Sequence, residues 1–302
     1  MSQNSATPLY WIASYPHSGD LLVRSFLQHL SKSFGYRPQD PANLQLLDRD
    51  LPWDVHAHFY ETVVGKKPTE LSEEEIAAAR PKVHEHISKN YPGLPVVKTH
   101  AVRGEFYGVP SINASVSLGS VYLIRNPLML APVFAVAGGK DVVSALKLLA
   151  TSEYRQPSTD THALEPWGSW SQNVASWTGN NVEGDLVVRF EDLMADPVGQ
   201  LTRVAEHLKM PVDKAQIGAA AKAALAEHGV TAKSNNPGAW KGAVSPNHAR
   251  ALIEIHARQM ARFGYLTNEA LNHAGLTREE ALKASARFED LARLPVTAAG
   301  NA

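Results

Sequence analysis

Short runs of apolar residues alternate along the chain with longer amphipathic stretches. Four of these runs are expected to be strands: Leu9–Ser14, Leu94–Lys98, Ser120–Ile124 and Leu186–Arg189. They lack a strict alternation of apolar and polar positions, which is typical of parallel strands that are buried on both faces. We therefore expect these runs to form the centre of a sheet.

The stretches between the runs have the periodicity of helices. Within Asp20–Phe34, large apolar residues recur every four positions from Leu22 onward and form one stripe. Ser72–His86 opens with Ser-Glu-Glu-Glu, a capping box that marks a helix start. Further helices are predicted over Gly168–Thr178, Pro197–Leu208, Pro246–Phe263 and Thr277–Leu294. This alternation predicts an α/β fold, a doubly wound sheet with central parallel strands and helices on both faces.

The pattern also suggests how the chain is divided. We expect a single α/β domain over residues 1–266. Within it, residues 39–69 have little periodicity and are rich in Pro, His and Trp, so they are expected to form a capping insertion. Residues 267–302 are expected to form a C-terminal helical appendage with a frayed tail.

Composition narrows the classes of function. With 29 Lys and Arg against 30 Asp and Glu, the chain has no global field to hold nucleic acid or an anionic membrane, and we expect neither partner. The absence of Cys excludes disulfides, thiolate metal sites and a Cys nucleophile. There is no secretion signal and no apolar run of about 18 residues, so we expect a cytoplasmic protein. The oligomeric state is left open.

The first predicted strand runs directly into a glycine-containing turn and a helix start. Unpaired backbone N–H groups and the positive end of the helix dipole meet at such a turn and favour an anion. Ser18 adds a hydroxyl donor, and Gly19 allows the backbone to come close to a ligand. The alternative is an ordinary strand-to-helix turn without a ligand. The GxxxxGK[ST] pattern is missing, which disfavours conventional ATP or GTP hydrolysis.

A resemblance to a family rests on six segments. WIASYPHSGDLLVRSFL resembles the first signature of cytosolic-type sulfotransferases. Five more segments resemble family segments in the same order: VVKTH, VYLIRNP, WGSWSQNVASW, LVVRFEDLMADP and PGAWKGAVSP. The match spans about residues 9–266. It implies a P-loop-like α/β domain that transfers a sulfuryl group from 3′-phosphoadenosine 5′-phosphosulfate (PAPS) to a hydroxyl or amine of a small-molecule acceptor.

Three residues are candidates for catalysis. His100 ends the VVKTH segment, where open α/β sheets place their ligands, and is the candidate general base. Lys98 shares one face of the strand with His100, so it can stabilise negative charge and lower the pKa of the imidazole. The alternative is a structural histidine bonded to a carbonyl. His17 stands where the family has the Lys or Arg that neutralises the leaving phosphate.

The resemblance also implies a donor site. Arg125 is matched to the residue that binds the 3′-phosphate, with an ion pair to Glu191 or Asp192 as the alternative. Phe190 matches an aromatic near the adenine. The expected donor-binding residues are Pro16, His17, Ser18, Gly19, Asp20, Leu21, Arg125, Phe190 and Lys233. We expect no metal site, because His84 and His86 lie about 200° apart around a helix.

Several positions depart from the family pattern. Asp20 replaces an Asn or Thr, Leu21 and Leu22 replace Thr-Trp, and Val133 replaces a Ser. A carboxylate about 4 Å from a phosphate costs about 4 kcal/mol at an effective dielectric near 20. Three hypotheses therefore stay open: a sulfotransferase, a catalytically degenerate binding protein of the same fold, and a transferase or hydrolase of another class. An Asp20 that caps its helix favours the first, and one that fills the turn favours the second.

Overall fold

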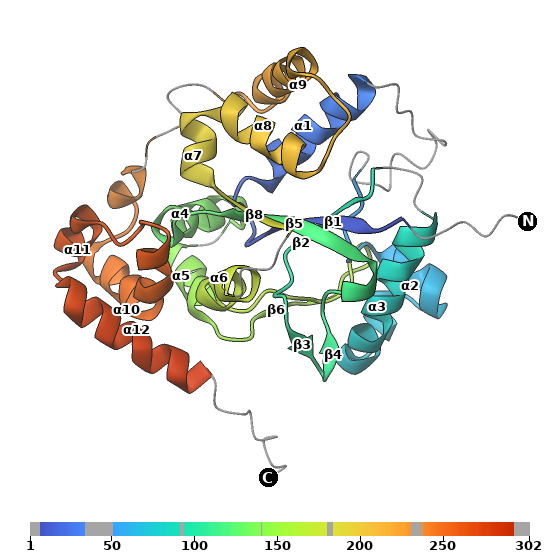
Figure 1. Cartoon of the computed structure of the whole chain (residues 1–302). Helices are drawn as coiled ribbons and strands as arrows, with labels where there is room; N and C mark the ends of the chain where they lie inside the picture. The colour runs from blue at the N-terminus through green and yellow to red at the C-terminus, as the bar shows by residue number, and fades with distance from the viewer. Residues whose placement is uncertain are drawn as a thin grey trace, which may run out of the picture. The chain divides into compact units, whose positions relative to one another are not determined.

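The computed structural model describes residues 7–33, 51–90, 94–139, 141–179, 184–230, 236 and 238–292. Within these residues the largest sheet has four strands in the order β2-β1-β5-β8, and each neighbouring pair is parallel (Figure 1). The strands are β1 (Leu9–Ser14), β2 (Val96–Thr99), β5 (Ser117–Ile124) and β8 (Asp185–Arg189). They coincide with the four runs predicted from the sequence, and the predicted α/β fold class is confirmed.

The winding of the sheet reverses between its two central strands. The chain passes from β1 to β2 on one side and then to β5 on the other side of β1. In open parallel sheets such a reversal opens a crevice for ligands at the carboxyl ends of the strands. The turn that follows β1 lies at this position, so the fold itself selects the region that the sequence singled out.

Residues 52–54 extend the sheet beyond β2. Trp53 pairs in parallel with Lys98, and the main-chain N–H of Lys98 donates to the carbonyl of Pro52 at 2.8 Å. The N–H of Asp54 donates to the carbonyl of Lys98 at 3.2 Å. The described part of the predicted capping insertion, residues 51–69, therefore begins with a single β-bridge at the edge of the sheet and continues into α2 (Ala57–Val64).

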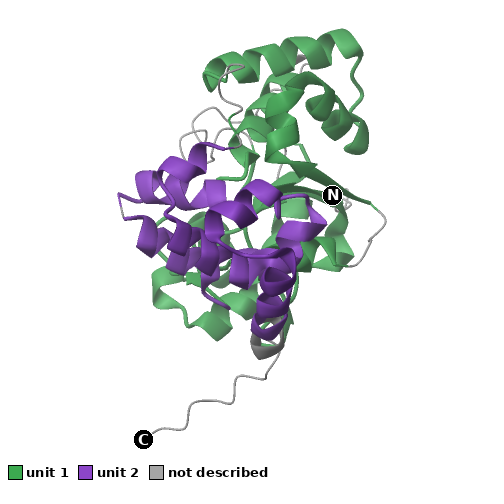
Figure 2. Cartoon of the chain, turned by 90° about the vertical axis from the view of Figure 1, so that its left-hand side faces the viewer, with its two compact units in different colours: residues 1–125, 153–168, 172–237 green, residues 126–152, 169–171, 238–302 purple. Residues whose placement is uncertain are grey.

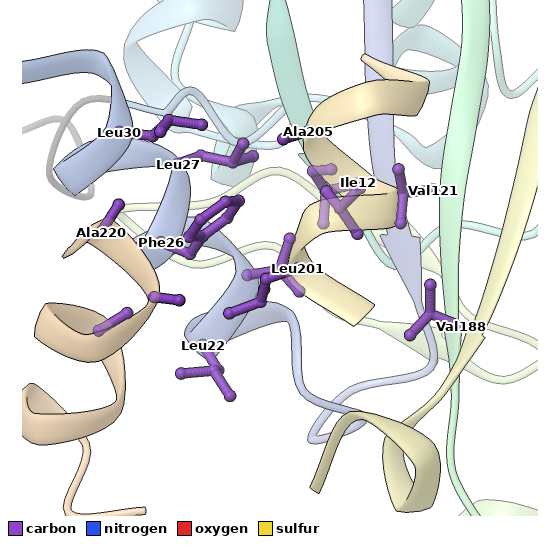
Figure 3. Packing of buried hydrophobic residues seen from close by; sticks show 14 of the residues in the cluster. Ile12, Leu22, Phe26, Leu27, Leu30, Val121, Val188, Leu201, Ala205 and Ala220 are labelled. Carbon is purple, nitrogen blue, oxygen red and sulfur yellow. The ribbon is translucent and has the colours of Figure 1, made fainter. Parts of the chain in front are cut away.

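Helices cover both faces of this sheet. Figure 1 shows α1 (Asp20–Ser33), α8 (Pro197–His207) and α9 (Lys214–Glu227) on one face and α3 (Glu73–Asn90) on the other. The residues that alternate along the strands point to the two helical layers. On the first face the packed side chains include Ile12, Phe26, Leu27, Leu30, Val121, Val188, Leu201 and Ala220 (Figure 3).

The second face is built mostly from rings. The indole of Trp11 meets the imidazole of His84 edge-on, with ring centroids 4.8 Å apart. Trp177, in α6 (Trp170–Thr178), stacks on Tyr122 with centroids 6.1 Å apart. Trp11 and Tyr122 alternate with the residues that face α1, because successive side chains of a strand point to opposite faces.

The helix-start signals of the sequence are present as hydrogen bonds. Ser72 and Glu75 form the reciprocal capping box of α3, with the N–H of Glu75 donating to Ser72 Oγ at 3.1 Å and the N–H of Ser72 donating to Glu75 Oε2 at 2.8 Å. Thr277 and Glu280 do the same ahead of α12 (Arg278–Ala292). α10 (Pro246–Arg262) is capped by Ser245, as its Ser-Pro start predicts.

Several elements were not predicted from the sequence. They are α2, α4 (Pro127–Ala137), α5 (Val142–Ala150), α7 (Phe190–Ala195), α9, α11 (Asn268–Ala274), and the strands β3 (Glu105–Phe106), β4 (Val109–Pro110), β6 (Arg155–Gln156) and β7 (Glu165–Pro166). The sequence of α4 is apolar nearly throughout, so no single stripe marks it as a helix.

The chain divides into two compact units (Figure 2). Unit 1 comprises residues 1–125, 153–168 and 172–237 and contains the four-stranded sheet; unit 2 comprises residues 126–152, 169–171 and 238–302. In unit 2 the hydroxyl of Ser285 donates to the carbonyl of Ile255 at 2.9 Å and fastens α12 to α10. The expected boundary at residue 266 falls inside unit 2 and stays a prediction. Among the described residues, no helix is both long and apolar enough to span a membrane.

Candidate functional site

The carboxyl ends of the parallel strands place the predicted site residues together in unit 1. β1 leads into the turn that contains His17, β2 leads into His100, β5 leads into Arg125 and β8 leads into Phe190. Since the strands are parallel and adjacent, their ends lie at one edge of the sheet. Residues that are far apart in the sequence can therefore act on a single ligand.

The turn after β1 has an unusual backbone. His17 and Gly19 have φ values of 65° and 106°, in the left-handed region. A Cβ on Gly19 would lie 2.9 Å from Phe190 Cδ2, so the position requires glycine both for its φ and for its space. The hydroxyl of Ser18 is buried and has no hydrogen-bond partner among the described residues. A buried polar group without a partner costs about 1–3 kcal/mol, and an anion that approached the turn would relieve that cost.

Arg125, which follows β5, contacts residues that follow β1 and β8. Its Nη1 donates to the carbonyl of His17 at 2.9 Å, and its guanidinium lies 3.9 Å from the ring centroid of Phe190. The structure thus brings together the turn, the predicted phosphate-binding arginine and the predicted adenine-side aromatic. Asp192, which the sequence offered as an alternative partner for Arg125, contacts Arg189 at 3.3 Å.

Asp20 faces the end of β2. It is the first residue of α1, and its Oδ2 lies 3.5 Å from the Nζ of Lys98. Burial raises the pKa of this carboxyl, but Lys98, His100 and Arg24 lower it by more, so the net pKa lies below its ordinary value. Asp20 is therefore ionised at neutral pH and offsets the charge of Lys98. The two orientations considered from the sequence, a helix cap and a plug of the turn, did not include this ion pair.

His100 is buried and held by β1. Its Nδ1 lies 2.8 Å from the carbonyl oxygen of Ser14. A carbonyl oxygen only accepts hydrogen bonds, so Nδ1 carries the proton and Nε2 is left as a proton acceptor. The sequence offered a structural histidine bonded to a carbonyl as the alternative to a base. The structure contains that carbonyl contact, and the contact itself leaves Nε2 as the proton acceptor. Burial first, and then Lys98, lower the pKa of the imidazole, although Asp20 and Glu165 act in the opposite direction.

The sequence reasoning missed Glu165. This carboxylate lies on β7, is 1% exposed, and accepts a hydrogen bond from the main-chain N–H of His100 at 2.6 Å. It also accepts from the indole N–H groups of Trp53 at 3.2 Å and Trp167 at 2.8 Å. The available signal was a lone acidic residue in the otherwise uncharged stretch Ala163–Trp170.

Aromatic rings surround the imidazole. The ring centroid of Trp53 lies 5.5 Å from that of His100, and the centroid of Trp167 lies 6.1 Å from it, both in edge-on geometry. Trp53 also lies 3.6 Å below the Nζ of Lys98 in a cation–π contact. The first described residues of the capping insertion therefore reach the candidate catalytic pair.

The remaining predicted residues are less closely involved. Pro16 is buried within the turn, whereas Leu21 points outward and is 56% exposed. Lys233 lies outside the described residues. Over the described ranges, no group of three or more His, Asp or Glu side chains is placed to hold a metal ion. The expectation that the protein uses no metal stays a prediction.

Comparisons with known proteins identify the family and the fold of the chain. A family model described as a sulfotransferase domain matches residues 8–264. No curated protein matches the sequence significantly. A crystal structure of mouse sulfotransferase SULT7A1 complexed with PAP is similar over 91% of this chain and 92% of that chain, at 15% identity and a TM-score of 0.53. A retinol dehydratase in complex with androsterone and inactive cofactor PAP is similar over 99% of this chain and 84% of that chain, at 16% identity and a TM-score of 0.47.

At these identities the structural likeness shows the fold alone, and the fold is the one described above. The family match is independent of that likeness and covers the four strands and the turn after β1. The chain belongs to the sulfotransferase domain family, a family of enzymes that transfer sulfuryl groups.

Proposed function

We propose that this protein transfers a sulfuryl group from PAPS to a hydroxyl or amine of a small-molecule acceptor. Membership of the family supports sulfuryl transfer in general. The observation that carries the specific proposal is the state of His100, whose Nδ1 is bound to the Ser14 carbonyl while Nε2 is left to accept a proton. Lys98 lies two residues earlier, in β2, and supplies positive charge beside it.

The donor is assigned to the turn after β1. When bound, PAPS supplies the sulfuryl group and a nucleotide phosphate as leaving group. Ser18 and the N–H groups at the start of α1 would hold the 5′-phosphosulfate, and Arg125 and Phe190 would face the 3′-phosphate and the adenine. The Ser18 hydroxyl, which has no hydrogen-bond partner among the described residues, supports this fit, as does the close approach of the turn to Phe190 that Gly19 allows. Lys233 is retained as a proposed donor contact from the resemblance.

Different side chains of the protein act in proton transfer and in charge stabilisation. His100 Nε2 takes the proton of the acceptor, while Lys98 stabilises the negative charge that develops on the transferring group. His17 replaces a family cation. Partial desolvation first, and then Arg125 and Lys98, lower the pKa of His17 against the opposing effect of Asp20, so His17 is mostly neutral at pH 7 although its side chain is exposed. Among the described residues, positive charge at the donor site therefore comes from Arg125 and from the part of the Lys98 charge that Asp20 does not compensate.

One observation favours a second candidate, a binding protein of the same fold without turnover. The ion pair of Asp20 with Lys98 and the neutral His17 together leave the site with less positive charge than the family pattern implies. A polyanionic donor then binds more weakly, and the enzyme and the binding protein differ only in whether a bound nucleotide leads to transfer.

Nucleotide titration followed by a transfer assay separates these functions. Adenosine 3′,5′-bisphosphate (PAP), which PAPS becomes when it loses its sulfuryl group, is titrated calorimetrically into three purified proteins. They are the wild type, His100→Ala and the control His248→Ala, which changes a partly exposed histidine in unit 2. Transfer from ³⁵S-labelled PAPS is then measured with a panel of phenols, alcohols and amines. We expect all three proteins to bind PAP and only His100→Ala to lose transfer.

Other outcomes change the assignment. The absence of heat and of any thermal shift at millimolar PAP would remove the donor from the proposal. Transfer retained by His100→Ala would remove His100 as the base. PAP binding by the wild type without transfer to any acceptor class would favour the binding protein.

A further inference from the structure

A single buried carboxylate, Glu165, connects the parts of the candidate catalytic site. Its Oε1 accepts from the N–H of His100 at 2.6 Å and from the indole of Trp53 at 3.2 Å, and lies 3.5 Å from the hydroxyl of Thr99. Its Oε2 accepts from the indole of Trp167 at 2.8 Å. Burial of a carboxylate is costly unless donors surround it, and these donors account for its presence in the interior.

The groups that donate hydrogen bonds to Glu165 belong to the candidate catalytic site. His100 is the candidate base, and its own main chain is bound. Trp53 lies against the Nζ of Lys98, with 3.6 Å between that atom and the ring centroid, and meets His100 edge-on. Trp167 meets His100 from another side. A rotation of Glu165 would therefore move the base and both adjoining indoles at once.

Charged and titratable groups face Glu165 from several elements. Arg80 and Tyr60, from α3 and α2, interact electrostatically with it, and Arg80 also donates to the carbonyl of the preceding residue, Leu164, at 2.6 Å. His100 faces it from the end of β2 and is itself faced by Lys98 and Asp20. The negative charge of Glu165 thus lies inside the same electrostatic cluster as the base.

We propose that Glu165 is the positioning residue of this site, which fixes the main chain of His100 and the indoles of Trp53 and Trp167 so that His100 Nε2 and the Lys98 ammonium are presented together. The role in sulfuryl transfer rests on the proposed function. The positioning itself is a property of the protein without substrate, and it can be measured separately.

Indole N–H resonances measure the hydrogen bonds directly. ¹H–¹⁵N spectra are recorded for the wild type, Glu165→Gln and the matched control Glu105→Gln, whose glutamate is exposed. The signals of Trp53 and Trp167 are assigned by single Trp→Phe changes. We expect Glu165→Gln to move both signals, because an amide replaces one of the two acceptor oxygens by a donor and removes the negative charge from the other. Glu105→Gln should move neither.

A third indole serves as an internal reference. The N–H of Trp11 donates to the hydroxyl of Ser117 at 2.8 Å. Its signal should stay in place in every variant. Signals of Trp53 and Trp167 that are unchanged in Glu165→Gln would overturn the proposal.

If Glu165→Gln does not fold, a second measurement on the unmodified protein tests the same hydrogen bonds. In the unmodified protein, the indole N–H groups of Trp53 and Trp167 should exchange with solvent deuterium slowly, since both are bonded to a buried acceptor. Exchange at the rate of a free indole would refute the network. In labelled-histidine spectra of a folded Glu165→Gln, the pKa of His100 should fall, because a neighbouring negative charge is lost.

Kinetics connect the positioning role to the reaction. We expect Glu165→Gln to lower kcat about 10- to 100-fold, since small misplacements of a catalytic group have effects of this order. KM for PAPS should change little, because the donor contacts are untouched. An unchanged kcat would overturn the role in transfer. A wild type that transfers no sulfuryl group would refute the proposed function while the resonance test of Glu165 still stands.

Discussion

Replacement of Asp20 by Asn tests how the altered donor turn controls the charge of the site. The carboxylate and the Lys98 ammonium are 3.5 Å apart, with side chains 9% and 8% exposed. At an effective dielectric of about 20, two unit charges at that separation attract by about 5 kcal/mol. Because the pair is nearly buried, solvent ions screen it little. The Asp20→Asn change removes this attraction while the size of the side chain is kept.

The expected result is tighter binding of PAP together with a less stable protein. A phosphate about 4 Å from a released Lys98 gains about 4 kcal/mol at the same dielectric, part of which is lost to desolvation of the ammonium. We therefore expect PAP to bind about 10- to 100-fold more tightly, at about 1.4 kcal/mol per tenfold. Without nucleotide, the unpaired Lys98 should lower the free energy of unfolding by about 3–5 kcal/mol.

Calorimetric titration of PAP and thermal unfolding with and without PAP measure both effects. The matched control is Asp160→Asn, which changes an exposed aspartate of unit 1. The control should bind and unfold like the wild type. If Asp20→Asn also binds PAP like the wild type and keeps its melting temperature, the ion pair does not govern the charge of the donor site.

Three further experiments test the turn after β1, the proposed base His100 and the buried His256. Gly19→Ala places a Cβ 2.9 Å from Phe190 at a φ of 106°, so calorimetry should show weaker PAP binding, and wild-type affinity would contradict the geometry of the turn. Burial and then Lys98 lower the pKa of His100 below 6.5, so kcat/KM should fall only below that pH. A fall in kcat/KM that begins above pH 6.5 would contradict a neutral base. Burial lowers the pKa of His256 to about 3, so the unfolded state binds the proton first. His256 should therefore contribute about 1.4 kcal/mol per pH unit to the loss of stability, measured in urea, as the pH drops from about 6.5 toward 3. His256→Gln should reduce the total slope by that amount, and an identical slope would refute the reasoning.

Local patterns in the sequence were sufficient for the four strands of the sheet and for most of the longer helices. The apolar runs correspond to β1, β2, β5 and β8, and the capping boxes at Ser72 and Thr277 form the expected hydrogen bonds. These features depend on neighbours within a few positions of the chain, and a linear pattern therefore reveals them. The positions of His100 and Arg125 followed in the same way, because both end a buried strand.

The partners of the site residues depended on the tertiary structure. Ile12 of β1 pairs with Lys98 of β2, and this register carries the lysine to the start of α1, where Asp20 becomes its counter-ion. The indoles that contact Glu165 come from residues 112 and 2 positions away in sequence. No periodicity encodes such contacts, because the direction of a side chain at the end of a strand is set by the strands and loops packed beside it. The sequence alone thus determined which segments form the sheet and end at the site, and the folded structure decided which charges and rings meet there.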